Sequence, residues 1–192
     1  MTEGPDPGEM NLLVLTNGFP NETMSSIPSS FVKHQIDAIK DRVNSVTVIS
    51  PVRTPVGILK GRTSENGYRY DNVEVHFPRI FYFPKVRRMD YLLAGTNSRI
   101  VRRLIIENGI EFDLIHSHFT WPSGVIGDRL SSSFRKPHVL TLHENSGWLM
   151  DLLNERPPTL ERAWRNADLL VRVNRRDLEE LRGNADGLPR GY

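Results

Sequence analysis

The chain has 192 residues, 38% of them hydrophobic, and a formal net charge of +2 from 25 Lys and Arg against 23 Asp and Glu. This length suits one domain with a single core, and the mild charge argues against a nucleic-acid-binding protein. The chain has no cysteine, which excludes disulfides and thiolate metal sites and fits a reducing compartment. We therefore expect a single domain in the cytoplasm.

The two ends of the chain are predicted to lie outside the folded domain. Residues 1–10 are rich in Gly, Pro and acidic residues without an apolar run, so they are predicted to be a disordered leader and not a signal peptide. Residues 11–183 are predicted to form the domain, and residues 184–192 the start of a linker. No stretch reaches the roughly 20 apolar residues of a membrane span, so membrane contact is expected to be peripheral only.

Along the domain, short apolar runs alternate with patterns of helical spacing. The sequence predicts strands at 11–16, 45–50, 73–77, 112–117, 137–143 and 168–173. It predicts helices at 31–39, 91–107, 124–134, 148–153, 160–164 and 175–181. Residues 51–72 are expected to form a long surface loop, and residues 78–84 an irregular segment. The predicted fold class is α/β, a single Rossmann-like domain with a doubly wound parallel sheet.

Ligands of such sheets bind beyond the carboxyl ends of the strands. The loop after the first strand holds Gly18 and a run of small residues that ends in Ser29 and Ser30. Exposed amides at the start of the next helix are suited to an anion or a sugar hydroxyl, although a polar loop without a ligand is the alternative. Neither G-x-G-x-x-G nor G-x-x-x-x-G-K-[ST] is present, so a nucleotide cradle has no direct support.

Three histidines and a glutamate lie at the ends of two later strands: His116, His118, His143 and Glu144. Adjacent parallel strands would bring these side chains together. One interpretation is a three-histidine metal site; another is recognition of a hydroxylated ligand by hydrogen bonds from imidazoles. A half-buried histidine that serves the structure alone is the third.

Aromatic and cationic residues alternate between the strand at 73–77 and the next helix. They are Phe77, Arg79, Phe81, Arg87 and Arg88. Such a segment could lie on an anionic membrane surface, or its rings could turn inward and its cations face solvent. The first alternative would place the protein peripherally on the inner face of the cell membrane.

The order of these segments resembles the N-terminal domain of family-four glycosyltransferases of the GT-B fold. The resemblance lies in Leu15-Thr-Asn-Gly-Phe-Pro20, Asp113-Leu-Ile-His-Ser-His-Phe119, Pro122-Ser-Gly124, Pro137-His-Val-Leu-Thr-Leu-His143 and Ala167-Asp-Leu-Leu-Val171. It spans residue 11 to about residue 181. Many relatives have a Gly-Gly pair in the first loop, where this chain has serines.

The resemblance implies specific roles for the candidate residues. His143 would lie near the reacting sugar and is the catalytic candidate, while Gly18, Ser29, Ser30, His116, His118 and Glu144 would bind the acceptor. No metal and no cofactor are expected. The resemblance further implies a second, C-terminal domain that binds the nucleotide sugar, and the sequence stops where the linker to it would begin.

We therefore expect the acceptor-binding half of a retaining hexosyltransferase, inactive alone, which acts on a glycan or lipid-linked acceptor in cell-envelope or polysaccharide biosynthesis. A standalone binding or regulatory module without catalysis is the main alternative. A metal-dependent hydrolase built on His116, His118 and His143 is another.

Overall fold

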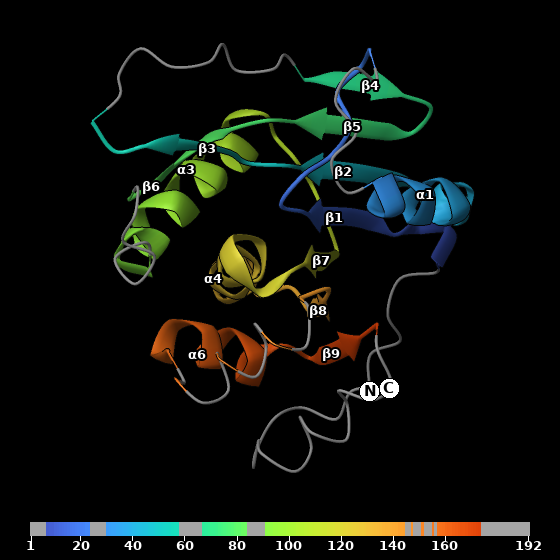
Figure 1. Cartoon of the computed structure of the whole chain (residues 1–192). Helices are drawn as coiled ribbons and strands as arrows, with labels where there is room; N and C mark the ends of the chain where they lie inside the picture. The colour runs from blue at the N-terminus through green and yellow to red at the C-terminus, as the bar shows by residue number, and fades with distance from the viewer. Residues whose placement is uncertain are drawn as a thin grey trace.

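Seven strands form one sheet in the part of the chain that the structure describes. This computed structural model describes residues 7–23, 30–57, 67–83, 91–144 and 157–173, with Gly147, Asp151 and Glu155. The strand order is β4-β5-β2-β1-β7-β8-β9, and all neighbours are parallel except β4 with β5 (Figure 1). The strands are β1 (Asn11–Leu15), β2 (Ser45–Ile49), β4 (Tyr68–Tyr70), β5 (Val73–His76), β7 (Leu114–His118), β8 (His138–Leu142) and β9 (Leu169–Arg172). The predicted doubly wound parallel sheet is confirmed.

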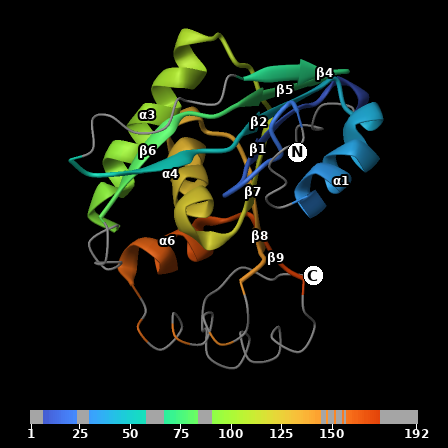
Figure 2. The ribbon, with the colours of Figure 1, turned by 45° about the horizontal axis from the view of Figure 1, so that its top comes forward.

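Helices cover both faces of this sheet (Figure 2). α1 (Ser30–Ile39) lies on one face, and α3 (Ala94–Glu107), α4 (Val125–Phe134) and α6 (Pro158–Asn166) lie on the other. Short helical turns are η1 (Pro7–Glu9), η2 (Lys40–Arg42), η3 (Tyr91–Leu93) and η4 (Thr120–Gly124). Helices on both faces explain why every residue of the central strands β2, β1, β7 and β8 is buried or half-buried.

The core is divided by the sheet because successive strand side chains point to opposite faces. In β1, Leu12 and Val14 pack in the cluster that contains Val32 and Ile36 of α1. Leu13 and Leu15 pack instead with residues of α3 and α4 on the other face, namely Val101, Ile105, Ile126 and Leu130. The continuous apolar run of β1 therefore serves two cores at once.

A second sheet, of two strands, forms where the sequence predicts no strand. β3 (Val52–Pro55) pairs in parallel with β6 (Arg79–Tyr82), so the expected loop over 51–72 and the expected irregular segment over 78–84 are wrong for these residues. The ladder between β2 and β5 continues into this pair through the bond from Val52 N to Pro78 O, at 2.8 Å. β4 also falls within the expected loop.

The edge of β6 is completed by a side chain of α3. The buried amide of Asn97 accepts from the N–H of Phe81 and donates to its carbonyl oxygen, both at 2.9 Å. The amide thus takes the place of a neighbouring strand and leaves neither backbone group of Phe81 unpaired.

The remaining predicted elements agree with the structure to within a few residues. Residues 7–9, expected in the disordered leader, form η1. The helix expected at 148–153 lies mostly outside the described residues, and the helix at 175–181 lies entirely outside them. Among the described helices, none is both long and apolar enough to cross a membrane.

Candidate functional site

Two imidazoles meet at the carboxyl ends of β7 and β8. His118 ends β7 and His143 follows β8, and the Nδ1 atom of the first lies 2.9 Å from the Nε2 atom of the second. His116 lies on the same side of β7, two residues earlier, and its ring centroid is 4.3 Å from that of His118. The predicted convergence of the three histidines is therefore observed.

His116 is held in place from the neighbouring strand. Its Nε2 atom lies 2.9 Å from Oγ1 of Thr141, which is paired in register with His118. Because one hydroxyl can donate or accept, this bond fits either neutral tautomer of His116.

Aromatic side chains surround the ring of His143. Phe31, in the first turn of α1, has its ring centroid 4.6 Å from that of His143, and Phe119 has its own at 5.1 Å. His143 itself is half-buried. Packing against three rings fixes its plane while part of the side chain stays accessible.

The loop after β7 is tied to the loop after β8 and to α6. The N–H of Thr120 donates to Oε1 of Glu144, and Nε1 of Trp164 in α6 donates to Oγ1 of Thr120 at 3.0 Å. Phe119 has a φ of 72° and the Trp121–Pro122 peptide bond is cis. A positive φ outside glycine is uncommon, and strained backbone of this kind clusters at functional sites.

The loop after β1 is connected to the same place. Nδ2 of Asn17 donates to the carbonyl oxygen of Trp121 at 2.7 Å, and Oγ of Ser123 donates to Oδ1 of Asn17 at 2.8 Å. Gly18 is buried, and its carbonyl oxygen accepts from Oγ1 of Thr16. The carboxyl ends of β1, β7 and β8 therefore form one connected polar site.

Burial keeps the imidazoles of the site neutral at pH 7. It lowers the pKa of His116 and of His143 to about 4 each, with a further contribution from His143 on the former and from the cation of Arg172 on the latter. Burial also lowers the pKa of His118 well below its usual range, and the two other rings add to the effect. A neutral ring can both donate and accept a hydrogen bond.

The pKa of Glu144 is shifted upward, whereas those of the histidines are shifted downward. Burial raises the pKa of its carboxyl group, against the N–H of Thr120, which lowers it. Its Oε2 atom is buried and has no hydrogen-bond partner among the described residues, and the same holds for Nε1 of Trp121. Unsatisfied buried polar atoms are rare in native proteins and mark a place for a water molecule or a ligand.

The serines expected to bind the acceptor are only partly described. Ser30 is the half-buried first residue of α1, directly before Phe31, while Ser29 lies outside the described residues. Sequence reasoning missed the contributions of Asn17, Thr120 and Trp164. The Asn-Gly and Trp-Pro pairs mark turns in the sequence, but contacts between turns so far apart in the chain leave no local signal.

The structure gives no support to the metal-dependent hydrolase. Nδ1 of His118 and Nε2 of His143 face each other at hydrogen-bonding distance. These two nitrogen atoms bond to each other and are therefore not directed at a common metal ion. Within the described ranges, no three side chains of His, Cys, Asp or Glu are grouped so that they could hold a metal ion.

The segment considered for membrane contact has a buried first residue. Phe77 is 6% exposed and packs beside Val73 and Val75 in the core cluster under α1, so it cannot meet a membrane. The alternation of strand side chains turns it inward with its two neighbours on β5. Arg79 is half-buried and Phe81 exposed, whereas Arg87 and Arg88 lie outside the described residues.

Comparison with known proteins identifies a family for most of the chain. Residues 29–190 match the model of Glycosyltransferase Family 4. An uncharacterized glycosyltransferase of Methanocaldococcus jannaschii is 35% identical over 81 residues, which cover 42% of this chain and 21% of that protein. The chain thus matches only about a fifth of the length of this curated relative.

Solved structures share the fold at low sequence identity. A sucrose-phosphate synthase structure from Thermosynechococcus elongatus superposes with a TM-score of 0.61 at 13% identity, covering 95% of this chain and 86% of that one. A UDP-glucosyltransferase from Polygonum tinctorium gives 0.59 at 10% identity, covering 100% and 52%. A UDP-forming α,α-trehalose-phosphate synthase from Burkholderia xenovorans gives 0.58 at 14% identity, covering 88% and 41%. These glycosyltransferases have the GT-B fold, and the likeness shows that this domain shares the architecture of one of its halves.

Proposed function

The chain belongs to glycosyltransferase family 4, and from that premise we propose that it is the acceptor-binding half of an enzyme that transfers a sugar from a nucleotide-sugar donor. The acceptor is a glycan or a lipid-linked sugar of cell-envelope or polysaccharide biosynthesis. The nucleotide sugar binds through a C-terminal domain, and the transfer retains the configuration of the anomeric carbon. We propose that the protein lies in the cytoplasm, because a chain without cysteine fits a reducing compartment.

The observation that carries this proposal is the pairing of His118 with His143 beside Glu144, at the carboxyl edge of a parallel sheet. Ligands of such sheets bind at this edge. Two neutral imidazoles and a buried carboxyl group with one unsatisfied oxygen offer both donors and acceptors. Hydroxyl groups of a sugar need this mixture.

His143 acts in this proposal as a hydrogen-bonding group and not as a strong base. With a pKa of about 4 it is uncharged at pH 7 and has little affinity for a proton. Its Nε2 atom is occupied by His118, so Nδ1 is the ring atom that remains for a sugar hydroxyl. A donor or acceptor fixed in this way lowers the barrier by holding the reacting group in position.

Gly18 and Ser30 contribute from the other side of the site. Gly18 belongs to the loop that Asn17 ties to Trp121, and Ser30 opens α1 next to Phe31. Ser29 completes this set in the proposal. The N–H groups in the first turn of a helix have no partner within the helix, so those of α1 are suited to an anionic or hydroxyl group of the acceptor.

The test is sugar transfer measured with the product of the complete reading frame that encodes this chain. Release of nucleoside diphosphate from UDP-glucose and GDP-mannose is followed in the presence of soluble glycans and of lipid extracts. We expect His143→Ala to lower kcat by about 100-fold, as for removal of a fixed hydrogen-bonding group in other enzymes. His34, exposed on the same α1 helix that carries Phe31, provides the matched control His34→Ala.

The possible results separate the proposal from its alternative. Full activity of His143→Ala would remove this residue from the site. Binding of a glycan, seen as amide shifts around His118 and Thr120, without transfer from either donor would favour a binding module. Anomeric configuration of the product, read by NMR, tests retention independently.

A further inference from the structure

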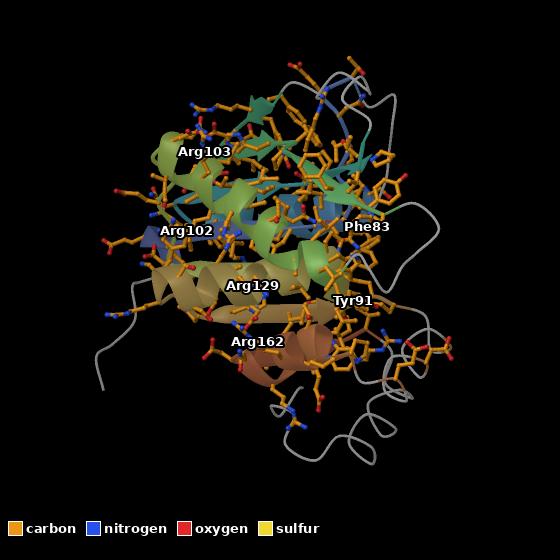
Figure 3. All side chains as sticks on the ribbon, turned by 90° about the vertical axis from the view of Figure 1, so that its left-hand side faces the viewer. Phe83, Tyr91, Arg102, Arg103, Arg129 and Arg162 are labelled. Atoms are coloured by element: carbon orange, nitrogen blue, oxygen red, sulfur yellow. The ribbon has the colours of Figure 1, made fainter. Side chains whose placement is uncertain are left out.

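A row of arginines runs over the outer face of the helix layer, away from the sheet (Figure 3). Arg102 and Arg103 come from α3, Arg129 from α4 and Arg162 from α6. Between α3 and α4 the surface is hollowed into a groove of about 200 Å³. The cations that line it are Arg99, Arg102 and Arg129, and we call it the arginine groove.

Close approach of the two helices brings these cations together. A Cβ atom at Gly95 of α3 would lie 4.0 Å from Nη1 of Arg129, so the guanidinium of α4 rests over the neighbouring helix at its glycine. Arg99 follows Gly95 by one helical turn on the same face. Ser98 of α3 and Ser133 of α4 line the groove as well, together with the apolar Leu130.

In this row, Arg103 and Arg162 lie outside the groove and are paired with carboxylates, whereas the arginines inside it are not. Nε of Arg103 lies 2.6 Å from Oε1 of Glu107, and Nε of Arg162 lies 3.0 Å from Oδ2 of the buried Asp128. Among the described residues, no carboxylate forms an ion pair with Arg99, Arg102 or Arg129. The guanidinium of Arg102 lies instead 5.8 Å from the ring centroid of Phe134, a contact that leaves its charge unbalanced.

Three like charges in one groove repel one another, and each adds to the potential that an anion would meet there. Planar guanidinium groups donate paired hydrogen bonds that match the oxygen atoms of a phosphate. We propose that the arginine groove is a binding site for a phosphate group, on a soluble phosphate or on the headgroup of an anionic lipid. It lies between α3 and α4, and it does not depend on the proposed sugar transfer.

The experiment is a titration of the 192-residue chain with inorganic pyrophosphate and with inorganic phosphate, followed by amide NMR. Co-sedimentation with phosphatidylcholine vesicles, with and without phosphatidylglycerol, forms the second arm. We expect saturable shifts at Gly95, Ser98 and Ser133 or pelleting that requires phosphatidylglycerol. The double variant Arg99→Ala/Arg129→Ala should weaken whichever binding is seen by about fivefold or more.

Arg103→Ala is the matched control, because it removes one cation from the same helix outside the groove. It should change the affinity by less than about twofold, since its charge is already balanced by Glu107. Saturation by pyrophosphate identifies a soluble ligand, and binding to phosphatidylglycerol vesicles alone identifies a lipid headgroup. No binding in either arm, or equal binding by the double variant with an unchanged melting temperature, overturns the proposal.

Discussion

Nδ1 of His118 and Nε2 of His143 lie 2.9 Å apart although 25 residues separate the two histidines in the chain. The register of β7 and β8 causes this approach, because His118 is paired with Thr141, two residues before His143. The ring of His118 is fixed by burial, since this residue is only 1% exposed. The more accessible ring of His143 is oriented by its bond to His118. The pair behaves as one unit in which one ring donates and the other accepts.

This pairing predicts different effects for two substitutions of His143. His143→Phe keeps an aromatic ring against Phe31 and Phe119 but leaves Nδ1 of His118 without a partner, which should cost about 1–3 kcal/mol of unfolding free energy. His143→Gln keeps a polar partner within reach and should stay within about 1 kcal/mol of wild type. Urea unfolding at pH 7 measures both.

The two variants should nevertheless share a loss of sugar transfer, because neither retains an imidazole Nδ1 atom. Equal stability of His143→Phe and the wild-type chain would show that the bond between the two rings contributes nothing to folding.

The stability of the domain should fall as the pH decreases from about 6.5 to 4. The pKa values of His116, His138 and His143 are lowered from 6.5 to about 4 by burial, so in this range the unfolded chain binds more protons than the folded one. The raised pKa of Glu144 acts in the opposite direction, but it opposes these three imidazoles together with His118, whose pKa is also lowered. Melting temperatures measured across this range provide the test.

A variant isolates one of the groups responsible. His143→Gln removes a titrating imidazole, so its melting temperature should decrease less steeply over the same pH range than that of the wild-type chain. A melting temperature that rises on acidification would contradict the lowered pKa values.

The central strands could be predicted from the sequence because burial on both faces leaves near-continuous apolar runs. β1 and β8 are examples, since each has only buried or half-buried residues. β3 and β6 could not be predicted, because each directly follows a proline. In the sequence, Pro51 and Pro78 mark the ends of the preceding strands, β2 and β5. The two strands are held by pairing with each other, and β6 also by the amide of Asn97. Asn97 lies 16 residues from its partner Phe81 in the chain, so no local pattern reveals the contact.

The candidate site was predictable to a similar extent. Histidines at the ends of two apolar strands could be placed together from the strand order alone, as His118 and His143 show. The connections made by Trp164 and Asn17 to the loop after β7 could not, because they depend on how α6 and the β1 loop pack against Thr120 and Trp121. The inward turn of Phe77 agrees with the alternative in which the rings of this segment face the core, and its two-residue spacing from Val75 is the signal for it.

Glu144 is predicted to serve the fold through one oxygen atom and not through its charge. Glu144→Gln retains an oxygen that accepts from the N–H of Thr120 and removes the cost of a buried charge, so at pH 7 it should be at least as stable as wild type. Glu144→Ala leaves the buried N–H of Thr120 unpaired and should lose about 1–3 kcal/mol. Urea denaturation of the two variants side by side decides, and a Gln variant less stable than the Ala variant would refute the assignment.

Two helical glycines should respond in opposite ways to the same substitution. A Cβ atom at Gly127 of α4 would lie closer than 3.0 Å to both Oγ of Ser117 and Nε2 of His138, and these two atoms are hydrogen-bonded to each other at 2.8 Å. Both side chains are fully buried, so neither can move away without breaking that bond. Gly127→Ala should therefore lower the free energy of unfolding by about 1–3 kcal/mol.

Gly95→Ala in α3 is the contrasting variant. Its new Cβ atom would meet its nearest atom at 4.0 Å, and the free energy of unfolding should rise by about 0.5–1 kcal/mol because alanine is the better helix former. Thermal unfolding of the pair distinguishes close packing at the Ser117–His138 contact from a general preference for glycine in these helices, because such a preference would destabilise both variants alike.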